Sequence, residues 1–300
     1  MESIGDILKN IIDGKHLNQD QTQIRETALQ NQDVQKFLSE NKIDQATLER
    51  SMDNLVFYVQ QLNSASNQRV MAGYRPKLFL NGNVIDITYA PTEQKQKEDE
   101  NSAAAKRIEL IDLPEKLRHV ELEEVDQNPD RMKAISEIAR FLIEFDNNKH
   151  ARGLYLEGDF GVGKTYLLAA LANSVARKGV KVIFLHVPSF IASLSSHFGD
   201  NSLNDEIERI ANAPVVIFDD IGAETLSEWS RDDVLGVILQ KRMDNELPTF
   251  FSSNLNLTML NEHFAQVKNS NNSLKAERLM ERINFVSKEV RVLGKNRRYR

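Results

Sequence analysis

Eight consecutive residues carry the strongest chemical signal in this sequence. They read Gly-Asp-Phe-Gly-Val-Gly-Lys-Thr and match the phosphate-loop pattern G-x-x-x-x-G-K-[ST] at every fixed position. Glycines let the backbone curl so that successive N–H groups point at phosphate oxygens, and a helix that begins there adds the positive end of its dipole. We therefore predict a nucleotide site formed by Gly158, Asp159, Phe160, Gly161, Val162, Gly163, Lys164 and Thr165.

The last two residues of this loop have separate roles. Lys164 would reach the β and γ phosphates, and Thr165 would offer its hydroxyl to Mg²⁺. Residues 152–157 before the loop read as a short buried strand, and residues 166–175 after it read as a helix with an apolar face. A glycine-rich turn that matches by coincidence is the alternative, but the strand-loop-helix context favours a phosphate site.

Two neighbouring acids stand at the end of a later apolar run. Residues 214–218 read as a strand buried on both faces, and Asp219 and Asp220 follow it. The carboxyl ends of parallel strands meet at one edge of a sheet, so these acids should lie beside the phosphate loop. Asp219 would help Thr165 hold Mg²⁺, and Asp220 would orient or deprotonate the attacking water. A strand followed by an acidic turn is the alternative.

Three more residues are catalytic candidates. Asn254 ends another apolar run, 249–253, where it would hold the lytic water against the γ phosphate, although an Asn at a strand end is also a common turn former. Arg278 and Arg282 lie four residues apart on one face of a predicted helix. Either could stabilise transition-state charge in the site of a neighbouring subunit, or both could belong to a solvated face.

The elements around these motifs predict an α/β domain over residues 108–300. Strands are expected near 152–157, 180–187, 214–219, 248–253 and 286–293, with helices between the first four. Such alternation predicts a parallel sheet flanked by helices. A further helix is expected from Pro129 to about Asn147, because Pro is favourable at a first helical position.

A smaller domain is expected over residues 1–90. Apolar residues recur at helical spacing up to about residue 62, and residues 77–89 then read as a β-hairpin around Asn81-Gly82. This gives a mainly helical N-terminal domain with a hairpin. Residues 91–107 are assigned to a linker, because the polar, charged stretch 91–105 lacks a hydrophobic period and fits either a linker or a frayed helix.

Composition limits the classes of function. A net charge of −6 argues against a protein that coats nucleic acid with a wholly basic surface, although residues 294–300 form a local basic segment. The chain has no cysteine and its histidines are scattered, so no zinc is expected. No signal-peptide pattern and no long apolar run is present, so we expect a cytoplasmic protein without a membrane partner.

The choice of nucleotide follows from motif order. Asn41-Lys-Ile-Asp44 satisfies the guanine-reading pattern of GTPases, but in those enzymes the pattern follows the phosphate loop, whereas here it lies far before it. We treat this match as a coincidence and predict that the ligands are ATP and Mg²⁺.

In their order and type these motifs resemble those of AAA+ ATPases over about 108–300. More narrowly, the chain resembles the bacterial replicative helicase loaders of the primosomal DnaI type, and this likeness extends over nearly the whole sequence. The segments that carry it are 73–78, 218–224, 228–236, 248–254, 278–283 and 294–298.

The resemblance implies a specific function. The AAA+ domain would bind ATP and single-stranded DNA, associate with copies of itself, and hydrolyse ATP slowly in step with helicase loading. The N-terminal domain would bind the hexameric replicative helicase, and Arg282 would be the arginine finger with Arg278 beside it. Some relatives carry a cysteine-rich zinc site in this domain, which a chain without cysteine cannot form.

Two other functions stay open at this stage. A transposition-regulator ATPase shares the same core but would act on duplex DNA. A catalytically quiet adaptor would use its nucleotide only to stabilise the fold, and its N-terminal domain would carry the biological function.

Overall fold

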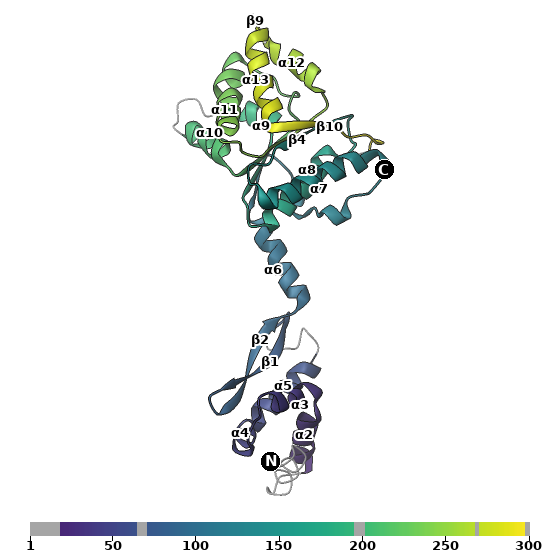
Figure 1. Ribbon diagram of the computed structural model, residues 1–300, viewed down its shortest axis with the longest axis vertical. Coiled ribbons are helices and arrows are strands. Elements are labelled where there is room, and N and C mark those ends of the chain that lie inside the picture. The colour runs from purple at the N-terminus through teal and green to yellow at the C-terminus, as the bar shows by residue number, and fades with distance from the viewer. Residues whose placement is uncertain (1–18, 65–70, 195–201, 268–269, 298–300) are drawn as a thin grey trace. The chain divides into compact units, whose positions relative to one another are not determined.

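The computed structural model describes residues 19–64, 71–194, 202–267 and 270–297 (Figure 1). Its contacts divide the chain into two units, Met1–Asp99 and Glu100–Arg300. The boundaries predicted from the sequence, at residues 90 and 107, bracket this division and stay a prediction. The part of the predicted N-terminal helical region that precedes residue 19 lies outside the described residues.

The first unit contains helices and one hairpin, as predicted. Asn31 and Asp44 start two of the helices, because their side chains accept hydrogen bonds from backbone N–H groups of the first turn. Gly82 forms the hairpin turn at a φ of 61°. The elements are α2 (Gln19–Gln30), α3 (Gln32–Glu40), α4 (Gln45–Arg50), α5 (Met52–Asn63), β1 (Tyr74–Asn81) and β2 (Val84–Pro91).

A small apolar core joins these helices to the hairpin. Val34, Leu55 and Ile85 are fully buried within it. The Ser51 hydroxyl strengthens the junction, because it donates to the Thr47 carbonyl and accepts from the Ile85 N–H, at 2.7 Å in both cases. The N-terminal unit therefore has a core of its own.

The segment assigned to a linker is helical. Helix α6 (Glu93–Ala105) covers most of it, and the division between the two units falls inside this helix. Of the two structures considered for 91–105, the helix is the one observed. Periodicity gave no sign of it, because its residues are polar on nearly every side up to Ala104 and Ala105, which are buried.

The second unit is built on a six-stranded parallel sheet with the order β10-β4-β7-β6-β5-β3. Five of these strands confirm the prediction. The four-residue β3 was not predicted, because it is short and pairs only with β5 at the sheet edge. The strands are β3 (Ile108–Ile111), β4 (Gly153–Glu157), β5 (Val182–His186), β6 (Val215–Asp219), β7 (Thr249–Ser253) and β10 (Ser287–Arg291).

Helices cover both faces of this sheet, which confirms the predicted α/β architecture (Figure 1). None of the helices in the described part of the chain is long and apolar enough to cross a membrane. The helices are α7 (Met132–Asn147), α8 (Lys164–Arg177), α9 (Val187–Ser193), α10 (Ser202–Asn212), α11 (Gly236–Asp244), α12 (Leu257–Ala265) and α13 (Ser273–Val286). Two antiparallel strands of two residues each, β8 (Gln266–Val267) and β9 (Ser270–Asn271), precede α13.

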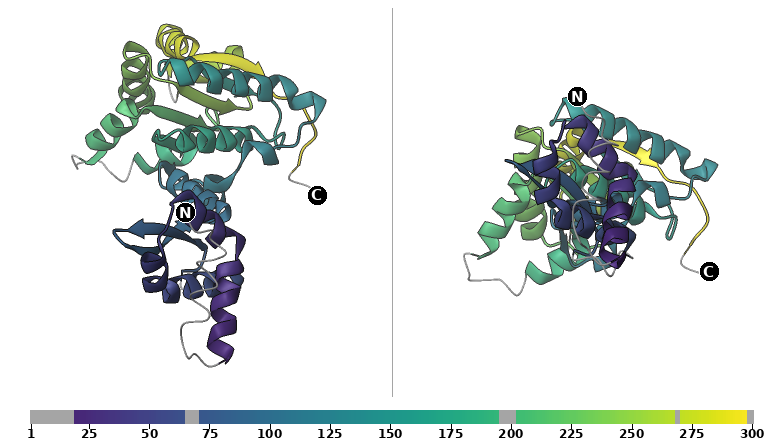
Figure 2. Two further views of the ribbon diagram at one scale, coloured as in Figure 1. Left: turned by 60° about the horizontal axis from the view of Figure 1, so that its bottom comes forward. Right: turned by 90° about the horizontal axis from the view of Figure 1, so that it is seen from below.

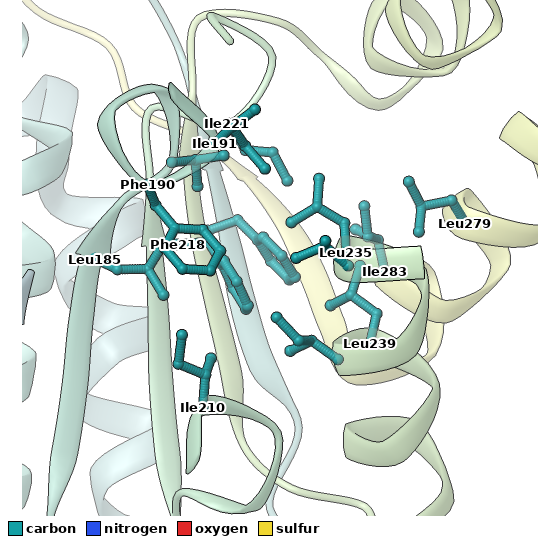
Figure 3. Close-up of a cluster of buried hydrophobic side chains, with 14 of the residues drawn as sticks. Leu185, Phe190, Ile191, Ile210, Phe218, Ile221, Leu235, Leu239, Leu279 and Ile283 are labelled. Atoms are coloured by element: carbon teal, nitrogen blue, oxygen red, sulfur yellow. The ribbon is translucent and has the colours of Figure 1, made fainter. Parts of the chain in front are cut away.

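Alternation along the strands creates two cores. Ile217 faces the core that contains α7 and α8, whereas its neighbour Phe218 faces the core that contains α9 to α13. Figure 3 shows Phe218 beside Leu185, with Leu235 and Leu239 approaching from the opposite side. Since both faces are covered, the strands read in the sequence as continuous apolar runs rather than as alternating ones.

A fully buried arginine ties the loops at one end of this sheet. The Arg242 guanidinium donates to the carbonyls of Ile210, Ala211, Ala213 and Pro248 at 2.7–3.2 Å. Its Nε donates to the Thr249 hydroxyl at 2.8 Å. Burial lowers the pKa of this guanidinium, but the five contacts give each of its three nitrogens at least one acceptor and give the four carbonyls a donor.

Replacing Arg242 with Met should destabilise the protein. The substitution keeps the volume but leaves buried carbonyls unpaired, so we expect the melting temperature to fall by roughly 5–10 °C, from about 2–3 kcal/mol of lost stability. Calorimetry would measure the change. Lys241→Met is the matched control, because this neighbour makes an ion pair at the surface. An Arg242→Met variant as stable as that control would contradict the structural role.

Candidate nucleotide-binding site

The strand order brings three loops to one edge of the sheet. The phosphate loop follows β4, Asn254 follows β7, and Asp220 follows β6. Because β7 lies between β4 and β6, these three carboxyl ends are neighbours. The structure therefore brings together the phosphate loop, both acids and Asn254, which are far apart in the sequence.

The phosphate loop depends on glycine at three close approaches. Gly158 has a φ of 152°, and a Cβ there would lie 2.2 Å from the carbonyl oxygen of Val292. Gly163 caps α8 at a φ of 100°, and a Cβ there would lie 2.6 Å from Nη2 of Arg131. Gly161 has a φ of 76°, and a Cβ there would lie 2.0 Å from Oδ1 of Asn296. A side chain at any of the three positions would meet both a positive φ and a neighbouring atom, and Gly158 and Gly163 are the two fixed glycines of the pattern.

The Lys164 side chain is buried inside the curl of this loop. Its Nζ donates to the carbonyl oxygens of Gly158 and Asp159, at 2.8 and 3.0 Å. It also donates to Oδ1 of Asn254 at 2.7 Å. The ammonium group therefore links the loop to the end of β7, at the mouth where the phosphates of a nucleotide would enter.

A hydroxyl and a carboxylate form the next part of the site. Thr165 donates to Oδ1 of Asp219 at 2.8 Å, and Ser252 donates to the same oxygen at 2.5 Å. Burial raises the pKa of Asp219, while these two hydrogen bonds oppose the rise and the charge of Asp220 adds to it. Hydroxyl and carboxylate oxygens are the ligands that Mg²⁺ takes in such sites, so Thr165 and Asp219 fit the predicted metal position.

Asp220 has an unusual backbone conformation. Its φ of 60° is left-handed, which is uncommon for a residue other than glycine. Ser252 holds this turn, because its hydroxyl accepts from the Asp220 N–H at 3.0 Å and its carbonyl accepts from the Ile221 N–H at 2.9 Å. The Asp220 carboxylate then accepts from Nδ2 of Asn254 at 3.1 Å. A chain of hydrogen bonds thus runs from Asp220 through Asn254 to Lys164.

Ser252 is a site residue that the sequence reasoning did not assign. It contacts both acids, yet a serine inside an apolar strand carries no pattern of its own. Two signals point to it: its place two residues before Asn254, since alternate residues of a strand face the same side, and its membership of segment 248–254, which carries the family resemblance.

The remaining loop residues differ in exposure. Val162 is buried in the core beside α8, whereas Phe160 is 62% exposed and Asp159 is also exposed. In this loop type the phosphates contact backbone N–H groups, so neither exposure nor burial of these side chains conflicts with their assignment.

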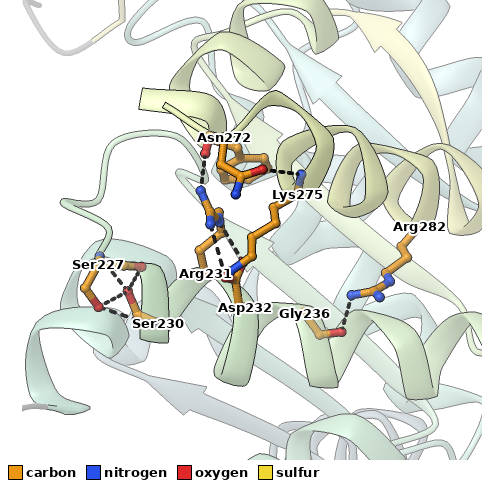
Figure 4. Close-up of polar contacts among 9 residues, drawn as sticks. Ser227, Ser230, Arg231, Asp232, Gly236, Asn272, Lys275 and Arg282 are labelled. Atoms are coloured by element: carbon orange, nitrogen blue, oxygen red, sulfur yellow. Dashed lines mark hydrogen bonds and ion pairs between the residues drawn. The ribbon is translucent and has the colours of Figure 1, made fainter. Parts of the chain in front are cut away.

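The two candidate arginines lie elsewhere in the unit, on α13, and Figure 4 shows one of them, Arg282. Arg282 donates through Nη1 to the carbonyl of Gly236 at 2.8 Å, at the start of α11. Arg278 is exposed, and its side chain makes no hydrogen bond or ion pair with any described residue. Within one chain, therefore, neither arginine is bonded to the phosphate loop or the two acids among the residues that the structure describes.

The segment after β10 packs against the phosphate loop. The Val292 N–H donates to the Glu157 carbonyl at 2.7 Å, and the Arg297 N–H donates to the Gly161 carbonyl at 3.0 Å. The Arg297 side chain forms an ion pair with Asp126. Figure 2 shows this yellow segment leaving β10 and running on toward the C-terminus. The basic segment considered for DNA contact thus contributes to the wall of the nucleotide site, while its residues 298–300 lie outside the described part.

Replacing Asp219 with Asn should separate stability from activity. The raised pKa means that the charged carboxylate costs stability, and this cost disappears as the pH falls and the group is protonated. We expect Asp219→Asn to abolish ATP hydrolysis but to melt about 2–4 °C higher than wild type at pH 7.5, without nucleotide. The advantage should shrink toward pH 5.

Thermal melts of both proteins at the two pH values measure this effect. Asp244→Asn, at an exposed site on α11, is the control and should show no such dependence on pH. An Asp219→Asn variant that melts below wild type at pH 7.5 would contradict the expected increase in melting temperature.

Comparison with known proteins assigns both parts of the chain to families. Residues 1–89 match the family described as primosomal protein DnaI N-terminus, and residues 88–300 match the family described as IstB-like ATP binding protein. The replicative helicase loader DnaI of Bacillus subtilis (strain 168) is 36% identical over 310 residues, covering 100% of both chains.

Other relatives match part of the chain. A solved crystal structure of DnaI is 39% identical, with a TM-score of 0.57 over 65% of this chain and 99% of that chain. An ATP-binding protein of insertion sequence IS1162 from Pseudomonas fluorescens is 33% identical over 135 residues, 44% of this chain and 58% of its own length. The match to Bacillus subtilis DnaI over the full length decides between the helicase loaders and the insertion-sequence proteins. The chain belongs to the DnaI family of replicative helicase loaders, and its second unit is an AAA+ domain of the IstB-like ATP-binding family.

Proposed function

We propose that this protein loads the replicative DNA helicase onto single-stranded DNA during primosome assembly, in the cytoplasm. The observation that carries the proposal is the match to Bacillus subtilis DnaI along the entire chain. It includes the N-terminal unit, which matches a family named for DnaI alone. We assign contact with the hexameric helicase to this unit, and ATP and DNA binding to the other.

The site supports ATP hydrolysis by positioned groups. The loop N–H groups and Lys164 would bind the triphosphate. Mg²⁺ would be held by Thr165 and Asp219, and when bound it would neutralise charge on the phosphates. Asp220 would orient or deprotonate the attacking water, with Asn254 fixing its carboxylate. Opening the bond between Lys164 and Asn254 would let both side chains turn to the γ phosphate.

A second copy of the chain would complete the site. Arg278 is exposed and Arg282 keeps further N–H donors beyond the one given to Gly236, so both can reach a neighbouring molecule. We propose Arg282 as the arginine that stabilises transition-state charge and Arg278 as its neighbour in the same interface. Hydrolysis would then require self-association through the AAA+ domain, which would couple slow turnover to loading.

A transposition-regulator function is the alternative, and the partial match to the IS1162 protein favours it for the second unit. That match covers 44% of this chain, whereas the match to Bacillus subtilis DnaI covers all of it. A loader binds helicase and single strands, whereas a transposition regulator would prefer duplex DNA and bind no helicase.

Co-purification with the replicative helicase of the same organism tests the proposal. We expect the full chain to retain the helicase through size-exclusion chromatography, and a variant lacking residues 1–90 to lose it while still binding ATP. The shorter variant's ATP binding controls for folding of the second unit. Preference for duplex DNA with no helicase bound by the full chain would favour the transposition function instead.

Asp220→Asn separates an active loader from a quiet adaptor. Asn keeps the size and one oxygen of the side chain but removes the charge that orients or deprotonates water. We expect ATP binding within about twofold of wild type, because no phosphate contact is lost, and ATP hydrolysis reduced at least about a hundredfold. Helicase loading should fall with hydrolysis. Wild-type loading by this variant would show that the nucleotide only stabilises the fold.

A further inference from the structure

Three arginines are among the largest fully buried side chains of this protein, and they differ in what surrounds them. Arg242 is satisfied by four carbonyls and a hydroxyl. Arg231 forms two hydrogen bonds with Asp232 and one with the Phe264 carbonyl, in the cluster drawn in Figure 4. Arg131 has neither kind of environment, although it is only 2% exposed.

The Arg131 guanidinium is poorly paired. Its Nε is buried without a hydrogen-bond partner, and its Nη2 lies 3.5 Å from the Gly163 carbonyl, at the limit of hydrogen bonding. Among the described residues no carboxylate lies within ion-pair distance of it. Asp126, whose charge favours the protonated form, is itself paired with Arg297. Burial lowers the pKa of Arg131, and the charge of Arg297 lowers it further.

The position of Arg131 adds to the free-energy cost of burying its charge. The side chain reaches the phosphate loop at Gly163, the residue that caps the N-terminus of α8. A helix N-terminus carries partial positive charge, so it repels a cation. In a structural role, a buried arginine would be paired with an acid or placed near a helix C-terminus. An anion at the loop is the species that would balance both positive charges.

We propose that Arg131 is a nucleotide-affinity residue, a buried cation that strengthens the hold of the loop on the phosphates of ATP. It acts through its charge and through its contact with Gly163, in an environment where exclusion of water strengthens electrostatic attraction. The proposal rests on the nucleotide site described above. The proposal also accounts for the ion pair between Arg297 and Asp126. Because Asp126 is paired with Arg297, the charge of Arg131 stays uncompensated.

Arg131→Met tests the proposal because a nucleotide-affinity role and a structural role predict opposite changes in the melting temperature without nucleotide. Met keeps a long apolar stem and removes the charge. We expect the dissociation constant for Mg-ATP to rise about tenfold, because the electrostatic attraction between the buried guanidinium and the phosphates is lost. The melting temperature without nucleotide should be unchanged or higher, because an unpaired buried charge is removed. Titration calorimetry and thermal melts measure the two quantities.

Two control variants sharpen the result. Arg140→Met on α7 makes the same change of net charge at a side chain that is 67% exposed, and should leave ATP affinity unchanged. Arg131→Lys keeps the charge and should retain most of the affinity. Unchanged ATP affinity in Arg131→Met would overturn the proposal. So would failure to fold or a lower melting temperature without nucleotide, since both indicate a structural arginine.

Lys164→Ala keeps this test distinct from the test of the site itself. If Lys164→Ala binds ATP as wild type does, the assignment of the phosphate loop is wrong. If Lys164→Ala loses ATP while Arg131→Met keeps it, the site stands and only the role of Arg131 fails.

Discussion

The insertion of β7 between β4 and β6 is the constraint on which the rest of the site depends. It separates the phosphate loop from the acidic turn by one strand, and Ser252 of that strand fills the gap by bonding to both acids. Asn254, at the end of the same strand, then joins Asp220 to Lys164. One strand therefore sets the spacing, the orientation and much of the electrostatic environment of the groups that face the nucleotide.

The buried charged residues of the second unit fall into two groups, which differ in how well their surroundings compensate the charge. Arg242 stabilises loops, because every polar atom around it gains a partner. Burial disfavours the charge of all three side chains, but Arg131 differs from Arg242 because its buried Nε has no hydrogen-bond partner and no carboxylate of the described residues pairs with it. Sites that bind charged ligands commonly carry such costs, since the ligand supplies the missing interaction. In our proposal, this contrast distinguishes Arg242, which stabilises the fold, from Asp219 and Arg131, which act on the nucleotide.

Much of this arrangement could be predicted from the sequence. The phosphate loop and the apolar runs that end in Asp220 and Asn254 carry strong local patterns, and the rule that parallel strands end at one edge brings them together. The contribution of Arg131 could not be predicted, because its contact with Gly163 depends on tertiary packing. The helical state of 93–105 and the strand β3 were missed for a simpler reason, which is that short or polar segments lack a hydrophobic period.

The segment after β10 packs against the phosphate loop but is synthesised after it, and this order has a consequence for folding during translation. The Gly161 carbonyl and the β4 backbone are bonded by residues translated long after the loop itself. A nascent chain therefore carries its phosphate-binding sequence for some time without the strand and the segment that shape it. The phosphate loop should therefore reach its final shape only after this last segment has been synthesised.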